Sequence, residues 1–132
     1  MVIDTSAIIA SIADEPDSAL YRNAIKGADG RLISAVTLLE TQIVLFARFG
    51  PTAVATLGEL IDQAAITVVP FDKKLAQAAF DAFRQYGKGQ GHPAQLNLID
   101  CAAYALAKEQ GLPLLFKGED FSRTDVVSAL SA

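Results

Sequence analysis

The sequence predicts an α/β fold, a three-layer α/β/α sandwich in which helices cover both faces of a mostly parallel central sheet of four to five strands. Short apolar segments alternate with longer segments of helical periodicity along the 132 residues. Most of the short segments lack the alternation of apolar and polar residues expected of a strand with one face in water, so these strands should be buried on both faces. The length suits one domain, spanning residues 1–132.

Four short apolar segments are expected to form the strands of this sheet. The first of them opens the chain and is rich in β-branched residues. The predicted strands are Met1–Asp4, Arg31–Ala35, Ile66–Pro70 and Leu112–Phe116. The segment Val126–Leu130 is expected to form either a short fifth strand or a final turn.

Helices are expected between these strands, and caps, prolines and glycines mark their ends. Thr5 and Ser6 open the first helix. Pro16 falls in the first turn of the second helix, which Gly27 and Gly30 stop. The remaining helices are predicted at Thr37–Gly50, Pro51–Ala65, Asp72–Gly87 (with Asp72 as N-cap) and Asn97–Gln110.

Composition narrows the classes of protein that this chain can represent. Apolar residues make up 52% of the chain and charged residues 20%, which excludes a disordered protein because such a chain can bury a core. The net charge of −4, from 11 Lys and Arg against 15 Asp and Glu, excludes nucleic-acid binding through a broad basic face. Any activity on nucleic acid must therefore use a local basic patch or a bound cation.

The sequence gives no sign of export or of a membrane span. Its single cysteine, Cys101, excludes an internal disulfide and a zinc site made of several cysteines. No apolar stretch approaches the ~20 residues of a membrane helix. The N-terminal segment contains an aspartate and lacks the basic region of a signal peptide. We therefore expect a cytoplasmic protein.

Acidic residues stand directly after two of the predicted strands. Asp4 ends the first strand, and Glu119 and Asp120 follow the fourth. Ligands of parallel sheets gather at the carboxyl ends of the strands, so these acids would share one crevice if the two strands are neighbours. The structural alternative for Asp4 is a cap of the following helix, a task that Thr5 or Ser6 could also perform. For Asp120 the alternative is an ordinary loop acid.

Two further acids lie among apolar residues of predicted helices. Glu40 is flanked on its helix face mainly by apolar side chains, where a lone carboxylate is costly unless a cleft solvates it or a partner pairs with it. Asp100 also has mostly apolar helical neighbours. The structural alternatives are a side chain at the edge of the apolar stripe for Glu40, and a capping box with Asn97 for Asp100.

A cluster of three or four such carboxylates would need a compensating cation. Two carboxylates 4 Å apart repel by about 4 kcal/mol at an effective dielectric constant of 20. Oxygen ligands without histidine or cysteine favour Mg²⁺ or Mn²⁺ over zinc. Such a site activates water and stabilises an oxyanion, which is the chemistry of phosphodiester hydrolysis. It would also supply the local positive charge that the chain as a whole lacks.

Four stretches of the chain resemble the PIN-domain ribonucleases of the VapC toxin type. They are VIDTSAIIA, SAVTLLE, GHPAQLNLIDCAAYALA and PLLFKGEDFSRTDV, which together cover most of the chain in the family order. The resemblance implies a single PIN-like domain and a Mg²⁺-dependent endoribonuclease, with RNA as substrate and Mn²⁺ as the alternative metal. It also implies a cognate antitoxin that holds the enzyme inactive, and a homodimer.

The resemblance assigns site residues by position. The implied catalytic acids are Asp4, Glu40, Asp100 and Asp120. Of these, Asp4 and Asp100 would bind the metal. The residues expected beside the metal and the substrate are Thr5, Ser6, Asn97 and Lys117.

Two positions depart from the family pattern. Ile99 stands where many relatives have glycine before the third acid, which alters packing at the helix entry but keeps the acid. Many PIN domains carry an acid at the end of the fourth strand, where this chain has the run Phe116–Gly118. Asp120 is the expected substitute, and Glu119 is its rival.

Two other functions stay open on the sequence. A degenerate PIN-like or receiver-like domain would bind a partner without catalysis. An aspartyl-phosphate phosphatase would also begin with a strand-end aspartate, but Ser6 stands where such an enzyme usually carries a second acid. His92 in a loop and Cys101 in a helix are expected to be structural residues.

Overall fold

The structure, a computed structural model that describes residues 1–130, contains a sheet of four parallel strands. The strands are β1 (Val2–Ile3), β2 (Leu32–Ser34), β3 (Thr67–Val69) and β4 (Leu114–Leu115). Their order is β3-β2-β1-β4, so β1 is paired on both sides. Of the two alternatives for Val126–Leu130, the structure has a turn, with a single bridge from Ser128 to Leu114. The predicted α/β class with a parallel sheet is confirmed.

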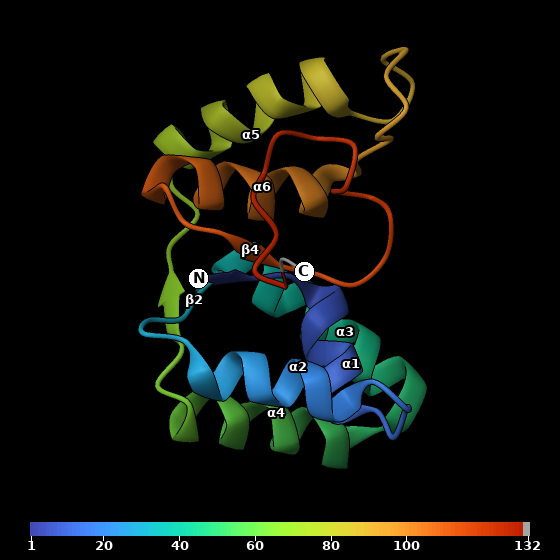
Figure 1. Ribbon diagram of the computed structural model, residues 1–132, viewed down its shortest axis with the longest axis vertical. Helices are drawn as coiled ribbons and strands as arrows, with labels where there is room; N and C mark the ends of the chain where they lie inside the picture. Colours follow the sequence, from blue (N-terminus) through green and yellow to red (C-terminus); the bar gives the residue numbers. More distant parts are fainter. Residues whose placement is uncertain (131–132) are drawn as a thin grey trace.

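Helices cover both faces of the sheet, which gives the three predicted layers (Figure 1). They are α1 (Thr5–Ile12), α2 (Ser18–Gly27), α3 (Ala35–Phe49), α4 (Pro51–Gln63), α5 (Lys73–Tyr86) and α6 (Leu98–Gln110). On one face, α5 and α6 form an apolar cluster with Val2 and Leu114. On the other face, α1 to α4 form a second cluster with Ile3 and Leu115. No helix within residues 1–130 combines the length and the apolar character needed to cross a membrane.

All four strands are shorter than predicted, and β1 and β2 end early because helix caps begin where these two strands end. Asp4 and Ser34, which were placed within predicted strands, are the N-cap residues of α1 and α3. Asp4 Oδ2 accepts from the Ser6 N–H at 3.0 Å, and Ser34 Oγ accepts from the Val36 N–H at 3.3 Å. Each side chain satisfies a helix N–H that has no intrahelical partner. For the same reason α3 begins at Ala35, two residues before its predicted start.

The start of α2 was predicted two residues too early. Pro16 and Asp17 form a turn, and the helix begins at Ser18. The turn is closed by Ser18, whose N–H donates to the Glu15 carbonyl at 3.1 Å and whose Oγ accepts from the Glu15 N–H at 3.0 Å. This bond between the Ser18 side chain and the backbone of Glu15 stabilises a turn in place of a first helical turn at Pro16, so α2 begins later than predicted.

The carboxyl ends of β1 and β4 lie side by side, as the shared crevice required. Ile3 aligns with Leu115, and the Asp4 N–H donates to the Leu115 carbonyl at 3.0 Å. On the other side of β1, α3 starts directly at the end of β2. The residues that follow three neighbouring strands therefore meet at one edge of the sheet.

Candidate active site

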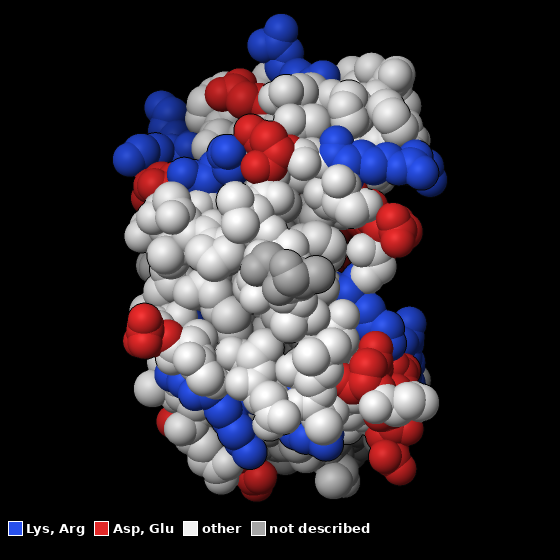
Figure 2. Space-filling model, viewed as in Figure 1, with Lys and Arg blue, Asp and Glu red and all other residues white. Residues whose placement is uncertain are grey.

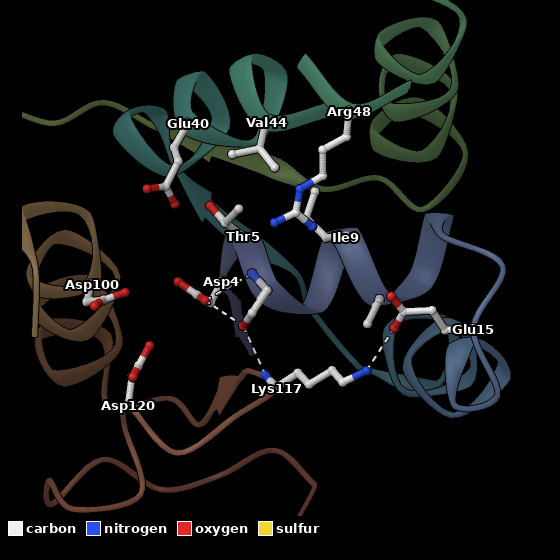
Figure 3. Close-up of a pocket in the computed structure, with 12 residues that line it drawn as sticks. Asp4, Thr5, Ile9, Glu15, Glu40, Val44, Arg48, Asp100, Lys117 and Asp120 are labelled. Atoms are coloured by element: carbon white, nitrogen blue, oxygen red, sulfur yellow. Dashed lines mark hydrogen bonds and ion pairs between the residues drawn. The ribbon is translucent and has the colours of Figure 1, made fainter. Parts of the chain in front are cut away.

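A pocket of about 360 Å³ opens at this edge of the sheet, and the four predicted acids are among the five carboxylates that line it (Figure 3). The four acids come from four separate segments: Asp4 after β1, Glu40 in α3, Asp100 in α6 and Asp120 in the loop after β4. These are the four acids that the sequence analysis assigned to the site, and the structure brings all of them into one pocket. Their metal-binding and catalytic roles stay predictions.

Asp4 is buried, with 5% of the residue exposed. Its Oδ2 accepts from the Ser6 N–H at 3.0 Å and from the Ser6 hydroxyl at 2.6 Å. Its Oδ1 is also buried and has no hydrogen-bond partner among the described residues. Burial raises the pKa of Asp4 above its ordinary value, against the effect of the hydrogen bonds from Ser6. The capping alternative is thus confirmed, and it leaves one carboxylate oxygen of Asp4 free for a ligand.

Asp100 follows the same pattern at the start of α6. Its Oδ2 accepts from the Asn97 N–H at 3.0 Å, while Asn97 Oδ1 accepts from the Asp100 N–H at 2.8 Å. This is the capping box that was its structural alternative. Burial is the largest cause of a pKa of about 7 for Asp100, and the charges of Asp4, Asp120 and Glu40 act in the same direction. Asp100 therefore caps α6 and also belongs to a cluster of acids whose charges influence one another.

The face of α3 that carries Glu40 forms one wall of the pocket. Glu40, Val44 and Arg48 line the pocket at intervals of four residues, which places them along the same side of the helix. Arg48 was missed by the sequence analysis. Its position eight residues after Glu40, on the same side of the helix, was a signal that could have found it.

A buried group of threonine hydroxyls holds α3 against α1. Thr5, Thr37 and Thr41 are each at most 7% exposed. The Thr41 hydroxyl donates to the Thr37 carbonyl at 2.7 Å and lies 3.0 Å from Thr5 Oγ1. Because Thr5 follows Asp4 and Thr41 follows Glu40, these contacts fix how the two acids lie relative to each other. Neither Thr37 nor Thr41 was among the site residues predicted from the sequence.

The loop after β4 presents Asp120 to the pocket and directs Glu119 elsewhere. Asp120 lines the pocket, whereas Glu119 does not, and Glu119 Oε2 accepts from the Ser122 hydroxyl at 3.1 Å. Gly118 has a φ of +104°, a backbone conformation that side chains with a Cβ rarely adopt. The geometry therefore favours Asp120 over its rival as the fourth acid of the pocket.

Three of the four residues expected beside the substrate line the pocket, and the fourth does not. Thr5, Ser6 and Lys117 line the pocket. Ser6 Oγ accepts from the Lys117 N–H at 3.0 Å and donates to Asp4, so it links the loop after β4 to the central acid. Asn97 does not line the pocket, because its side chain caps α6. A contact of Asn97 with substrate stays a prediction.

The ammonium of Lys117 is bound by two acids that the sequence analysis missed. Lys117 Nζ lies 2.8 Å from Asp17 Oδ2 and 2.9 Å from Glu15 Oε2. The bonds to Asp17 and Glu15 raise the pKa of Lys117. No local pattern could pair Lys117 with Glu15, since the two are 102 residues apart.

His92 and Cys101 do not line the pocket. His92 Nδ1 accepts from the Ala94 N–H at 3.0 Å, and the ring packs edge-on against Tyr86 at 4.8 Å between centroids. Cys101 is buried in α6, and burial raises its pKa to about 11. A neutral thiol with so high a pKa is a poor metal ligand at neutral pH. Both residues thus have contacts that fit the structural roles expected of them.

The donor set fits a divalent cation that prefers oxygen ligands. Asp4 has an unpaired buried oxygen, and Asp100 carries a carboxylate whose charged form burial disfavours. Within residues 1–130, no group of three or more Asp, Glu, His or Cys side chains is arranged to hold a metal ion. Mg²⁺ usually binds one or two carboxylates and keeps several waters. Asp4 and Asp100 could therefore act as the direct ligands, with Glu40 and Asp120 contacting bound water.

Comparison of the sequence with known families and proteins finds relatives that match it over most of its length. The PIN domain family matches residues 1–127. The ribonuclease VapC28 of Mycobacterium tuberculosis is 46% identical over 130 residues, which cover 98% of each chain. A ribonuclease VapC of Mycolicibacterium smegmatis is 47% identical over 128 residues, covering 97% of this chain and 98% of the relative.

Solved structures with low sequence identity share the fold. VapC20 of Mycobacterium tuberculosis, described as a toxin that cleaves the sarcin-ricin loop, superposes with a TM-score of 0.79 at 17% identity, covering 96% of this chain and 95% of that one. A toxin–antitoxin complex from Klebsiella pneumoniae gives a TM-score of 0.71 at 17% identity, covering 99% and 98%. These likenesses support the PIN-like arrangement of sheet and helices.

We predict that the free energy of unfolding of the metal-free protein falls as the pH rises from about 4 to about 7. Asp100 loses its proton near pH 3.8 in the unfolded chain and near pH 7 in the folded one, so rising pH favours the unfolded state over this range. Asp100→Asn should show a shallower fall, because the amide does not titrate. Urea unfolding in chelator at several pH values measures both slopes. Equal slopes in parent and variant would contradict the prediction, and the exposed Asp81→Asn is the control that should keep the parent slope.

Thr41→Val should lower the free energy of unfolding by roughly 1–3 kcal/mol, because valine removes two buried hydrogen bonds of the Thr41 hydroxyl, one to the Thr37 carbonyl and one to Thr5 Oγ1. Thr41→Ser should keep most of the stability, since it keeps the hydroxyl. The control is Thr56→Val on α4, which removes a similar bond to the carbonyl four residues back, at 3.1 Å, from an exposed site. Urea unfolding at constant pH compares the variants. Equal losses at Thr41 and Thr56 would show that the buried hydroxyl group does not hold α3.

Proposed function

The chain belongs to the PIN-domain family, among its VapC members, and from this premise we propose that it is an endoribonuclease that depends on a divalent metal. Its substrate would be RNA, and the bond broken a phosphodiester bond. We further propose a toxin of a toxin–antitoxin system that a cognate antitoxin neutralises. A single domain spanning residues 1–132 and a location in the cytoplasm belong to the same proposal.

The observation that carries the proposal is the convergence of four carboxylates on one pocket, with a buried oxygen of Asp4 left unpaired. Such a site is electrostatically unfavourable by itself, because burial and mutual repulsion act against the charged forms. A divalent cation, Mg²⁺ or alternatively Mn²⁺, would reverse both effects. Asp4 and Asp100 would hold it.

The bound ion would stabilise the negative charge that develops on the phosphate during hydrolysis. Glu40 and Asp120 would complete the acidic pocket and orient the attacking water through their carboxylate oxygens. Ser6 would keep Asp4 in place, because its hydroxyl and its N–H both donate to the same oxygen, Oδ2. Oδ1, which has no hydrogen-bond partner among the described residues, would be the oxygen available to hold the ion. No covalent enzyme intermediate is required.

Four side chains are proposed on the substrate side of the pocket. They are Thr5, Ser6, Asn97 and Lys117. Thr5 and Ser6 lie next to Asp4 and could contact a phosphate oxygen or a water. The Lys117 ammonium is held by Glu15 and Asp17, so a phosphate would have to compete with these two carboxylates for it.

One finding supports the alternative of a PIN-like module that binds a partner without catalysis. No group of three or more potential ligands in the described part of the chain is arranged to hold a metal ion. An aspartyl-phosphate phosphatase is disfavoured, because Ser6 is bonded to Asp4 where that chemistry wants a second acid. Metal-dependent turnover distinguishes the nuclease from the binding module.

The proposal includes two protein partners, the antitoxin and a second copy of the chain. One side of α3 exposes an apolar stripe at helical spacing, away from the residues that line the pocket. Its members, each 56–62% exposed, are Leu39, Ile43 and Phe46. Large apolar side chains exposed in a row are typical of a surface that another chain covers. We assign this stripe to the homodimer.

RNA cleavage should require both the divalent ion and the two proposed ligands. The purified protein should cleave RNA with Mg²⁺, lose cleavage in chelator and recover it with added Mg²⁺ or Mn²⁺. Asp4→Asn and Asp100→Asn should each lower the rate by two orders of magnitude or more. A metal ion that stabilises the developing oxyanion lowers the activation barrier by several kcal/mol, and each variant would lose that stabilisation. Asp81→Asn on the exposed face of α5 should cleave like the parent. Cleavage that persists in chelator and in both pocket variants would refute the mechanism.

Phe46→Glu should convert a dimer into a monomer, because it places a charge within the apolar stripe. Light scattering coupled to size-exclusion chromatography measures the mass of parent and variant. Leu20→Glu, at an apolar residue of α2 with similar exposure, is the matched control and should stay dimeric. A parent that is monomeric at every concentration, or a Phe46→Glu variant that stays dimeric, would overturn the assignment.

A further inference from the structure

We infer that Arg48 binds a phosphate of the RNA strand next to the one that is cleaved. The inference rests on the proposed function, and it assigns a substrate contact outside the acidic cluster. Two cations line the pocket, Arg48 and Lys117. Their surroundings differ, and the difference points to Arg48 as the one available for a polyanion.

Lys117 is already neutralised by its contacts. Its Nζ lies within 3 Å of carboxylate oxygens of both Glu15 and Asp17. Arg48, by contrast, has no carboxylate within ion-pair distance among residues 1–130, and its guanidinium makes no hydrogen bond to those residues. It therefore presents its planar set of N–H donors to whatever enters the pocket. That donor geometry matches two oxygens of one phosphate.

Arg48 lies apart from the acidic cluster along the wall of the pocket. It is two helical turns along α3 from Glu40, about 12 Å at the rise of an α-helix. Figure 3 shows its side chain running back along the wall of the pocket, toward Thr5 and Ile9, rather than away from the pocket. The acidic end and the guanidinium are thus at separate places in one pocket. A strand whose scissile phosphate lies at the acids would bring a neighbouring phosphate to Arg48.

The net negative charge of the protein opposes RNA binding, so a single well-placed cation in the pocket matters. The net charge is −4, and Figure 2 shows lysines and arginines interspersed with acids, without a broad basic patch on the visible face. The pocket itself is lined by five carboxylates, those of Asp4, Glu15, Glu40, Asp100 and Asp120. A metal ion held by Asp4 and Asp100 would compensate the negative charge only at the end of the pocket where these two residues lie. An RNA strand that continues along the pocket needs a second positive group, and Arg48 is placed to supply it.

The experiment measures binding of a short, fluorescently labelled single-stranded RNA of mixed sequence, by anisotropy in Mg²⁺ at several salt concentrations. The Asp100→Asn chain is the background, so that the strand stays intact. Arg48→Ala should weaken binding about tenfold, as expected for one lost charge-assisted contact. The slope of log affinity against log salt should become shallower by about 0.7, the value for one phosphate contact on a single strand. Arg48→Lys should keep the slope and recover part of the affinity.

Arg84→Ala is the control, since Arg84 is an exposed arginine on α5 that does not line the pocket. It should leave affinity and slope unchanged. In the otherwise unaltered chain, Arg48→Ala should raise KM for RNA cleavage and keep kcat and the Mg²⁺ requirement. If the Asp100→Asn background binds RNA too weakly to be measured, the comparison of KM values tests the inference in its place.

Two results would overturn the inference while leaving the proposed function in place. The parent could cleave RNA with Mg²⁺ while Arg48→Ala changes neither affinity, salt slope nor KM. Alternatively, Arg84→Ala could weaken binding as much as Arg48→Ala, which would indicate diffuse attraction. A parent that neither binds nor cleaves RNA would refute the proposed function and the inference together.

Discussion

The burial of negative charge at the carboxyl edge of the sheet is the constraint on which the site depends. Asp4 and Asp100 are both buried, and burial raises the pKa of each. Each is held by a hydrogen-bonded cap at the N-terminus of a helix, α1 for Asp4 and α6 for Asp100. The positive end of a helix dipole offsets part of the cost of a carboxylate at that position. The remaining cost is what a divalent cation would remove.

The fold serves this constraint through the order of its strands. β1 lies between β2 and β4, so the residues after all three strands meet at one edge. α3 then carries Glu40 along the opposite wall, and the buried threonine hydroxyls hold this helix against α1. The Lys117 ion pairs tie the loop after β4 to the segment between α1 and α2. The pocket is therefore built by contacts between segments that are distant in the sequence.

The sequence was sufficient for those parts of the site that local patterns encode. Strand-end acids and apolar helix faces singled out the candidate acids, apolar periodicity predicted the layers, and the family resemblance assigned four of the acids to the site. The caps coexist with the pocket because each uses one carboxylate oxygen. The carboxyl ends of β1 and β2 were predicted too late, because Asp4 and Ser34 stop these strands by capping helices. The pairing of Lys117 with Glu15 was beyond reach, since it depends on how distant segments pack. The choice of Asp120 over Glu119 depends on the turn at Gly118 and also needed the structure.

Calorimetric titration of Mg²⁺ into the parent protein, Asp4→Asn and Asp100→Asn near pH 7.5 tests the central claim most directly, because it requires no knowledge of the RNA target. The account predicts saturable binding to the parent and a loss of that binding in both variants. Saturation at 100 times the dissociation constant should also stabilise the parent by about 2.7 kcal/mol. Binding that is absent from the parent, or that is unchanged when either aspartate is replaced, would contradict the claim that these two buried carboxylates hold the ion.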